Sequence, residues 1–279
     1  MSYKTILVHA DHSTHAAERI RIAANLATTE NAHLIGVAMT GISRFTYEVR
    51  ALGPAGPNLE TYIEFLRTRA MRALTEFESI AQGMGVLSLE KRLVDDEAGA
   101  GISLQARYCD LVVIGQNDPN EPSPTVAPDF PAFCIRNCGR PVLLVPYTGR
   151  FEPVGKRVLI AWDGGAEATR AVTSAIPLLK HADHVTVAIF DSSRKPTVHG
   201  RQPGADIALY LARHSVNVEV MQRTADSDIG NTLLSLATDL SSDMIVMGGY
   251  GHARFREIVL GGVTRTVLES MTVPVLMSH

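Results

Sequence analysis

Cysteine is scarce in this sequence. Only three occur in 279 residues, and all of them lie in the first half, at Cys109, Cys134 and Cys138. A small, odd number of cysteines does not make a disulfide framework and is typical of a reducing compartment. Long apolar runs are missing as well, since none approaches the roughly 20 residues that span a bilayer, and the first residues lack the pattern of a signal peptide. We therefore expect a soluble, cytoplasmic protein without a membrane partner.

An excess of one charge is also absent, because 26 lysines and arginines oppose 29 aspartates and glutamates, for a net charge of −3. This balance gives no electrostatic basis for binding nucleic acid. Three catalytic signatures are missing too, namely Cys-x-x-Cys, Gly-x-Ser-x-Gly and the P-loop pattern. Their absence argues against thiol redox chemistry, against hydrolysis by a serine at a nucleophile elbow, and against a P-loop nucleotide site.

What the sequence does contain is an internal repeat. Three segments of the first half return in the second half in the same order: Lys4–Asp11 as Lys156–Asp163, Cys109–Gly115 as Ser242–Gly248, and Arg140–Val145 as Val273–Ser278. The glycine that ends the second segment and the proline in the third are 26 positions apart in both copies. Such a repeat indicates duplicated structural units, and the chain length suits two domains of about 140 residues. The expected domains are 1–148 and 156–279, joined by a linker at 149–155.

The repeated segments are short, nearly continuous apolar runs bounded by Asp, Gly or Pro, which is typical of strands buried on both faces of a parallel sheet. Amphipathic segments with helical periodicity lie between them. This alternation predicts an α/β fold of two doubly wound domains, each a five-stranded parallel sheet with helices on both faces. We expect strands at 5–10, 33–38, 88–94, 110–115, 142–146, 157–162, 184–190, 217–223, 244–248 and 274–278, and helices at His15–Thr28, Thr61–Gln82, Glu167–Leu179, Ile229–Leu240 and Val263–Met271.

The pattern that points to chemistry follows the fourth strand of the second half. Gly248, Gly251 and Gly261 have the spacing Gly-x2-Gly-x9-Gly, and an expected helix starts directly afterwards. Glycines let the backbone approach a phosphate closely, and a helix N-terminus offers unpaired N–H groups and partial positive charge. Ligands of doubly wound sheets bind at the carboxyl ends of the strands. The pattern therefore predicts a phosphate-binding loop, with a plain glycine turn as the alternative; the loop also contains His252, Arg254 and Arg256.

With these residues the chain resembles the ATP-binding branch of the universal stress protein family. The family pattern is an Asp that closes the first strand, and Gly-x2-Gly-x9-Gly-(Ser/Thr) followed by a Val-Ser/Thr pair. Asp163 matches the aspartate, the three glycines match, and Val263 and Thr264 match the closing pair. The resemblance covers essentially the whole chain as two copies, and it implies an adenine nucleotide alpha hydrolase-like fold.

The resemblance also implies a ligand and its contacts. The ligand would be ATP, or AMP or ADP, with Mg²⁺ shared between phosphates and water. Ala161, Asp163 and Ile189 would line the adenosine side. The ribose and phosphates would be held by the loop and its flanks, through Met247, Gly248, Gly251, Arg254, Gly261, Gly262, Val263 and Thr264.

Two departures modify this expectation. Position 262 is glycine where the family has Ser or Thr, so one hydroxyl that would bond a phosphate is missing and binding should be weaker. The first half keeps the length of the loop and loses its residues, because Asp118, Pro128, Asp129 and Pro131 stand in register with Gly251, Gly261, Gly262 and Thr264. Prolines remove donors and carboxylates repel phosphates. We expect that the first half does not hold ATP in this way.

Two other patterns have a metal interpretation and a structural one. In His9–His15, imidazoles and a carboxylate have the chemistry of zinc ligands, but a cap of the next helix by Asp11 or Ser13, with the histidines solvated around it, is the preferred interpretation. Cys134 and Cys138 share a helix face at spacing i, i+4. Two thiols without further ligands are more typical of a core than of a zinc site.

Three functions are consistent with the sequence. The resemblance implies a stress-linked regulatory protein that binds a nucleotide without fast catalysis. The alternatives are a slow ATP hydrolase or adenylyl-transfer enzyme, for which Asp163 is the nearest candidate base, and a scaffold without ligand. The last strands, Val142–Pro146 and Pro274–Ser278, are apolar edges, which predicts that the two halves pair through them and leaves a homo-oligomer open.

Overall fold

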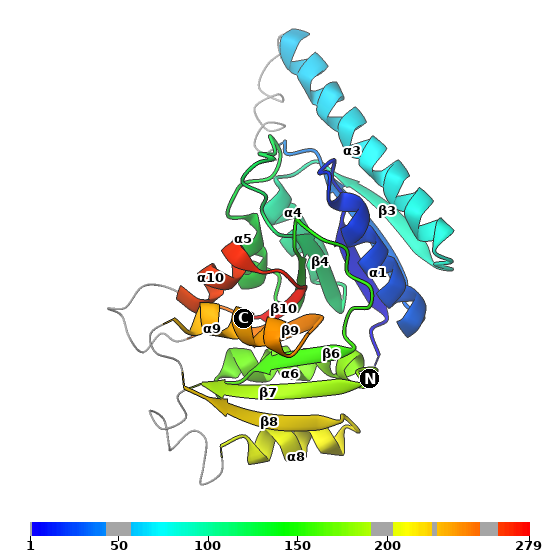
Figure 1. Ribbon diagram of the computed structural model, residues 1–279. Coiled ribbons are helices and arrows are strands. Elements are labelled where there is room, and N and C mark those ends of the chain that lie inside the picture. The colour runs from blue at the N-terminus through cyan, green and yellow to red at the C-terminus, as the bar shows by residue number, and fades with distance from the viewer. Residues whose placement is uncertain (1, 43–56, 191–202, 225–227, 252–261) are drawn as a thin grey trace. The chain divides into compact units, whose positions relative to one another are not determined.

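The computed structural model describes residues 2–42, 57–190, 203–224, 228–251 and 262–279. Arg254 and Gly261 of the predicted site, with His252 and Arg256, lie outside these residues. The chain divides into two compact units, residues 2–140 and residues 141–279. Figure 1 shows their helices and strands.

The first unit is a parallel sheet with helices. Its strands lie side by side in the order β3-β2-β1-β4, and every neighbouring pair is parallel. The unit consists of β1 (Thr5–His9), α1 (Ala16–Glu30), β2 (His33–Met39), α3 (Pro57–Gly83), β3 (Leu89–Val94), α4 (Ala98–Ala106), β4 (Leu111–Gly115) and α5 (Phe130–Asn137).

The second unit repeats this arrangement and extends it. Its strand order is β5-β10-β9-β6-β7-β8, and all neighbouring pairs are parallel except β5 and β10. The unit consists of β5 (Val142–Val145), β6 (Arg157–Ala161), α6 (Ala166–Leu179), β7 (His184–Phe190), α8 (Ala205–Arg213), β8 (Val218–Arg223), α9 (Ile229–Asp239), β9 (Met244–Gly248), α10 (Gly262–Ser270) and β10 (Val275–Ser278).

The doubly wound α/β fold predicted from the repeat is confirmed, and each predicted strand is found within one residue at either end. The strand at 142–145 groups with the second unit. There it runs antiparallel to β10, with Leu143 opposite Leu276. The domain limits 1–148, 149–155 and 156–279 stay predictions. The predicted pairing of the two halves with each other stays a prediction as well.

The central strands form the cores because their side chains are apolar on both faces of the sheet. Val112, Val113 and Leu159 are fully buried, for example. A repeated aspartate fixes the start of the first strand in each unit. Asp110 accepts hydrogen bonds from the N–H groups of Lys4 and Thr5, and Asp243 accepts them from the start of β6. The repeat therefore includes matching polar contacts as well as matching apolar runs.

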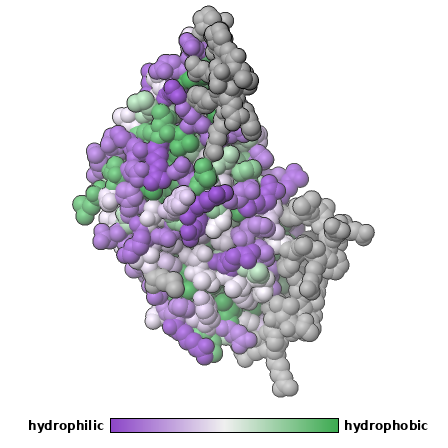
Figure 2. All heavy atoms as spheres, turned by 180° about the vertical axis from the view of Figure 1, so that it is seen from behind, coloured by the Kyte–Doolittle hydropathy of each residue, from purple (hydrophilic) through white to green (hydrophobic). Residues whose placement is uncertain are grey.

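Helix α3 carries both buried and exposed apolar side chains. Phe77 is fully buried, whereas Leu59, Tyr62, Phe65 and Met71 are exposed. Figure 2 shows hydrophobic residues gathered in the upper part of its view, which belongs to the first unit, among a mostly hydrophilic surface. Among the described helices, none has the length and apolar composition needed to cross a membrane.

Each sheet has one position at which the direction of winding reverses. β1 lies between β2 and β4, and β6 lies between β7 and β9. After the first strand, the chain adds its next strands on one side of that strand and then crosses to the other side. A crevice therefore opens at the carboxyl ends of the two central strands. The two candidate sites are therefore the ends of β1 and β4 and the ends of β6 and β9.

Candidate functional site

In the second unit, the segment after β6 makes a tight turn into α6. Asp163 holds this turn, because its Oδ1 accepts a hydrogen bond of 2.8 Å from the N–H of Gly165. Gly164 has a φ of 73°, a conformation that favours glycine. Ala161, at the end of β6, lies opposite Met247 of β9. The structure thus brings together three of the predicted site residues at the carboxyl ends of two adjacent strands.

Gly248 ends β9 at a place where no larger residue fits. A Cβ atom there would lie 2.7 Å from the backbone nitrogen of Ala168 and 2.8 Å from Cβ of Glu167. Both neighbours belong to the first turn of α6, so the glycine lets this helix approach the end of β9. At Gly251 a Cβ would lie 2.8 Å from Oε2 of Glu167. The first two glycines of the predicted loop therefore lie against the amino end of α6.

The predicted helix after the third glycine is present as α10. Its first residue, Gly262, is exposed, and a Cβ there would meet no atom of the described residues within 4 Å. Thr264 is buried in the first turn, and its hydroxyl oxygen accepts a hydrogen bond of 3.2 Å from the N–H of Tyr250. This bond ties the amino end of α10, which includes Val263, to the segment that follows β9. The helix N-terminus and the first part of the glycine loop are therefore held at one edge of the sheet.

The other predicted adenosine contact, Ile189, is less accessible. Its side chain is fully buried, and its Cδ1 lies 2.8 Å from the position that a Cβ of Gly204 would take. The side chain packs against the start of α8. Any contact of Ile189 with a ligand must therefore use its backbone.

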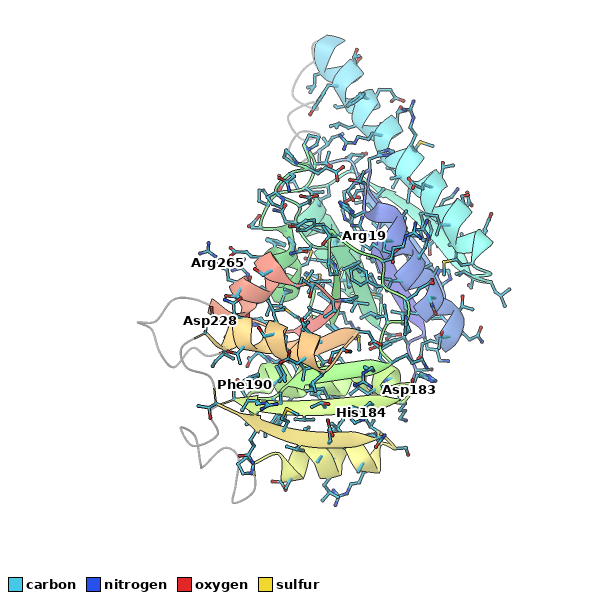
Figure 3. All side chains as sticks on the ribbon, in the orientation of Figure 1. Arg19, Asp183, His184, Phe190, Asp228 and Arg265 are labelled. Atoms are coloured by element: carbon cyan, nitrogen blue, oxygen red, sulfur yellow. The ribbon has the colours of Figure 1, made fainter. Side chains whose placement is uncertain are left out.

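Sequence analysis did not single out Glu167. Its carboxylate lies beside Gly251 and forms an ion pair with Arg170, at 3.0 Å. An acidic residue in the first turn of a helix is common, so only its distance from the loop marks it. Arg265 in α10 also lies near this edge, but its guanidinium is paired with Glu269 at 2.7 Å. In Figure 3, Phe190, Asp228 and Arg265 mark the carboxyl edge of this unit, opposite Asp183 and His184.

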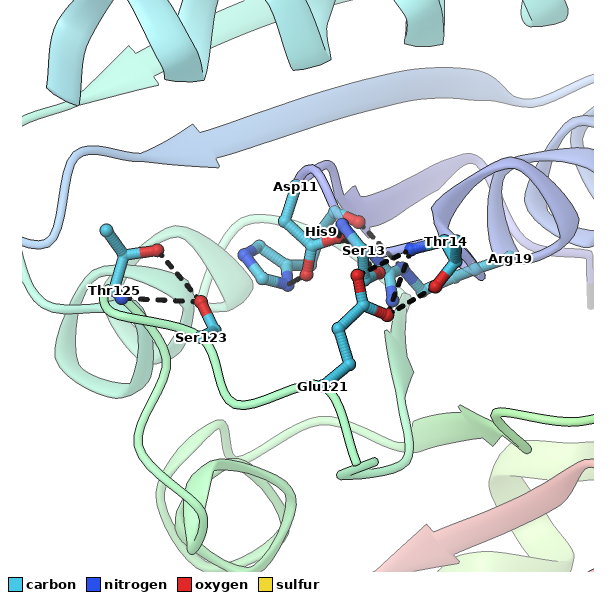
Figure 4. A network of polar contacts seen from close by, with 8 residues as sticks. All are labelled: His9, Asp11, Ser13, Thr14, Arg19, Glu121, Ser123 and Thr125. Carbon is cyan, nitrogen blue, oxygen red and sulfur yellow. Dashed lines mark hydrogen bonds and ion pairs between the residues drawn. The ribbon is translucent and has the colours of Figure 1, made fainter. Parts of the chain in front are cut away.

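The corresponding crevice of the first unit is filled by side chains. Arg19 of α1 is buried and donates one hydrogen bond to the backbone oxygen of His9 and another to Oδ1 of Asp11, both of 2.8 Å. Its Nη1 lies 2.4 Å from the position that a Cβ of Gly115 would take at the end of β4. The ring of Phe130, at the start of α5, lies 5.0 Å from that of His9. Figure 4 shows the buried cluster around His9, Asp11 and Arg19.

This cluster corrects the expectation for the segment His9–His15. His9 is not solvated but 2 % exposed. Asp11 accepts hydrogen bonds from the N–H and hydroxyl of Ser13 and from Arg19, while the N-cap residue of α1 is His15, without a side-chain cap. The predicted cap is therefore wrong, because neither Asp11 nor Ser13 caps the helix.

The buried cluster also shifts acid–base equilibria. Burial is the main cause that lowers the pKa of His9 to about 4, against the opposing charge of Asp11. Burial alone would raise the pKa of Asp11, but Arg19 and the hydrogen bonds from Ser13 hold it well below its usual range. The cluster therefore consists of a neutral imidazole and a partly buried ion pair at neutral pH.

Other residues that the sequence singled out in the first unit also lack the features of a ligand site. Asp129 is the N-cap residue of α5, and Pro131 stands in its first turn, so this helix start lacks the N–H that a glycine or threonine would offer. Cys109, Cys134 and Cys138 are buried and free. Burial raises the pKa of Cys109 to about 12, which keeps this thiol protonated.

Comparisons with known proteins agree with a fold of two repeated domains. The model of the universal stress protein family matches the chain twice, at residues 2–146 and 155–279. A universal stress protein of Synechocystis is 28% identical over 144 residues, which are 51% of this chain; the match spans about half, 48%, of that relative. A universal stress protein from Archaeoglobus fulgidus superposes over 98% of this chain and 97% of its own, with a TM-score of 0.71 and 14% identity. A functionally unknown protein of Pseudomonas aeruginosa covers 98% and 92%, with a TM-score of 0.58 and 17% identity.

Proposed function

Because this chain belongs to the universal stress protein family, we propose that its second half binds ATP or a closely related adenine nucleotide at the carboxyl ends of β6 and β9. The first half does not take part in this binding. In this proposal the protein is a stress-linked binding protein that responds to the bound nucleotide, rather than a fast enzyme.

One observation carries the proposal. Gly248 has no room for a Cβ, and Thr264 accepts a hydrogen bond from Tyr250, so the glycine loop and the amino end of α10 meet beside the end of β6. Backbone N–H groups at a helix N-terminus attract phosphate through their hydrogen bonds and the helix dipole. The same edge in the first unit is closed by Arg19 and Phe130. The contrast supports a nucleotide in one half only.

The proposed contacts follow from the places of the residues. Ala161 and Asp163 at the end of β6, with the backbone of Ile189, would face the adenosine. Gly248, Gly251 and the first turn of α10 would face the ribose and phosphates, together with the predicted contacts Met247, Arg254, Gly261, Gly262, Val263 and Thr264. Mg²⁺, which would neutralise the phosphates, would be shared between them and water.

The hydrogen bond made by Asp163 supports a nucleotide-binding function rather than a catalytic one. Its carboxylate holds the turn before α6 through the N–H of Gly165. A general base has to reach the proton that it removes and have a suitable pKa. A carboxylate that holds the backbone of its own turn is placed for structure.

Titration of the intact protein with ATP, by isothermal titration calorimetry, tests the proposal. Gly262→Asp adds a charge at the amino end of α10, where the described part of the chain leaves open space for a side chain, so we expect the fold to persist. We expect ATP affinity to fall at least tenfold, about 1.4 kcal/mol. Gly83→Asp is the matched control, because Gly83 also has open space and lies at the end of α3 in the first unit.

The alternatives predict different results. No binding of ATP by the unmodified protein, and no rise in its melting temperature, would favour a scaffold. Turnover of ATP well above background that is lost in Asp163→Asn would favour an enzyme. Equal affinities in Gly262→Asp and Gly83→Asp would place the nucleotide elsewhere.

A further inference from the structure

Three side chains from two distant segments of the first unit come together beside the filled crevice. They are His15, the N-cap residue of α1, and Asp118 and Glu121, which follow β4. One nitrogen of the imidazole and one oxygen of each carboxylate all lie within 4.8 Å of one another. The pairing of β1 with β4 brings these segments together, although more than 100 residues separate them. We propose that this group, the His15 cluster, binds a divalent transition-metal ion such as Zn²⁺.

The ligand set has the chemistry and spacing of such a site. Imidazole nitrogen and carboxylate oxygen are both common ligands of Zn²⁺. In tetrahedral zinc, bonds of about 2.0–2.1 Å place neighbouring ligand atoms roughly 3.3–3.4 Å apart. Nε2 of His15 lies 3.4 Å from Oδ2 of Asp118. That distance is long for a hydrogen bond and fits two ligands of one ion.

Outer hydrogen bonds hold the two carboxylates in place. Oδ1 of Asp118 accepts a hydrogen bond of 2.8 Å from the N–H of Asn120, while its other oxygen faces His15. Both oxygens of Glu121 lie 3.1 Å from the backbone nitrogen of Thr14, whose hydroxyl also donates to Glu121, as Figure 4 shows. A carboxylate has about four acceptor positions, so these bonds leave room for a metal. Such outer contacts orient the ligands of metal sites.

Charge favours a cation at this place. Two carboxylates so close together repel each other unless a positive charge lies between them. Arg19 is engaged by Asp11 and by the backbone of His9. In the repeat, Asp118 stands in register with Gly251 of the second half. The position that faces phosphate in the proposed nucleotide site is thus acidic in the first half. An acidic position favours a cation, whereas its counterpart in the second half favours an anion.

The same residues have an interpretation without metal, in which Glu121 holds the segment before α1 and His15 pairs with Asp118. The experiment has to separate the two. Zinc chloride is titrated, without nucleotide, into the full chain after chelator treatment and dialysis, by isothermal titration calorimetry. We expect one Zn²⁺ per chain, bound at least tenfold more weakly in each of His15→Gln, Asp118→Asn and Glu121→Gln.

Two matched controls keep the test specific. His12→Gln changes another histidine of the same segment, and Glu97→Gln changes an exposed carboxylate elsewhere in the first unit. Both should leave zinc affinity within about threefold. Zinc should also protect His15, but not His12, from diethyl pyrocarbonate in the unmodified protein, which tests the site without any variant. Absence of zinc binding, binding that survives all three substitutions, or an unprotected His15 would overturn the proposal. None of these results depends on ATP.

Discussion

The two halves share a strand order and a crevice between their first and fourth strands, and they differ in what lies there. In the first half, His9 ends β1, and Arg19 reaches from α1 to the end of β4. In the second half, the repeat has Ala161 at the position of His9, and Gly248 at the end of β9 lies against the first turn of α6. The same backbone thus carries a crevice filled by side chains in one copy and a glycine loop in the other.

This difference shows which parts of the repeat are structural. The buried strands and the aspartates that hold their starts occur in both copies. The residues at the carboxyl ends differ in size and charge, because they are not needed to build the sheet. Function in doubly wound folds belongs to these ends. The predictions below test whether the first half has exchanged a ligand for internal contacts.

The largest effect should come from Arg19→Met, which keeps much of the volume of the side chain and removes its charge. Asp11, which is 20 % exposed, would lose its partner. Breaking a fully buried pair costs about 3–5 kcal/mol, so we expect a loss near the lower end of that range, about 3 kcal/mol. Urea unfolding followed by circular dichroism should show this loss. Trp162, the single tryptophan, lies in the second half, so its fluorescence should change much less. Similar shifts in both signals would contradict a contribution confined to the first half.

The next effect concerns pH. His9 has a pKa of about 4 in the folded protein because it is buried, whereas an unfolded histidine titrates near 6.5. Between these values the unfolded chain binds a proton that the folded chain does not, so stability should fall as pH decreases from about 6.5 to about 4, by about 2–3 kcal/mol. The paired Asp11 has a depressed pKa, so its own contribution is lost only at lower pH. Urea unfolding at pH 7.5 and 4.5 measures the change.

His9→Leu is the control for this pH effect. It removes the titrating group from a place where the second half has Ala161. The difference in stability between the two pH values should shrink in this variant by most of the amount assigned to His9. An unchanged difference would show that other groups cause the loss of stability.

The sequence predicts the sheets and the glycine loop, but it does not predict the filled crevice. Strands such as Leu111–Gly115 are short runs whose composition alone marks them as buried. Arg19 looks like one polar residue of an amphipathic helix, and its contacts with Gly115 and Asp11 appear only when β1 and β4 pair. His9 and Phe130 are more than 100 residues apart, so no local pattern connects them.

From the sequence, no range is predicted for three short helices, α4, α5 and α8. α4 contains Gly101, and a Cβ there would lie 2.5 Å from the sulfur of Met39. Packing selects this glycine against its low helix propensity, so the sequence hides the helix. α8 has only nine residues, a length at which periodicity seldom decides between helix and strand.

A smaller effect should follow from Gly262→Ser, which restores the hydroxyl of the family pattern. Among the described residues, no atom lies within 4 Å of the position that a Cβ at Gly262 would take, so we expect serine to be accepted. We expect ATP to bind a few-fold to tenfold more tightly, because the net contribution of a typical hydrogen bond is about 0.5–1.5 kcal/mol and a tenfold gain is about 1.4 kcal/mol. The gain should be smaller for adenosine. Calorimetry on this variant and on Gly83→Ser checks the prediction, and weaker ATP binding would contradict it.

The smallest effect concerns a carboxylate in the first turn of a helix, which both halves pair with an arginine. Glu167 and Arg170 form an i, i+3 ion pair at the start of α6, and Glu18 and Arg21 form one at the start of α1. Glu167 lies beside Gly251, where its negative charge repels phosphates, although Arg170 and solvent screen it. We therefore expect Glu167→Gln to tighten ATP two- to fivefold, with a weaker effect on ADP and none on adenosine.

The pair in the first half supplies the control. Glu18→Gln removes the same charge from the same kind of ion pair, and it should leave the affinity for ATP unchanged. Calorimetry on both variants, at low and at high salt, separates a direct charge effect from a change in the helix, because salt should reduce the gain only if it is electrostatic. Weaker ATP binding in Glu167→Gln would assign the carboxylate a different role, as a group that holds Mg²⁺ or its water. In that case the loss should disappear when Mg²⁺ is withheld, and the acidic residue beside the loop would belong to the nucleotide site rather than oppose it.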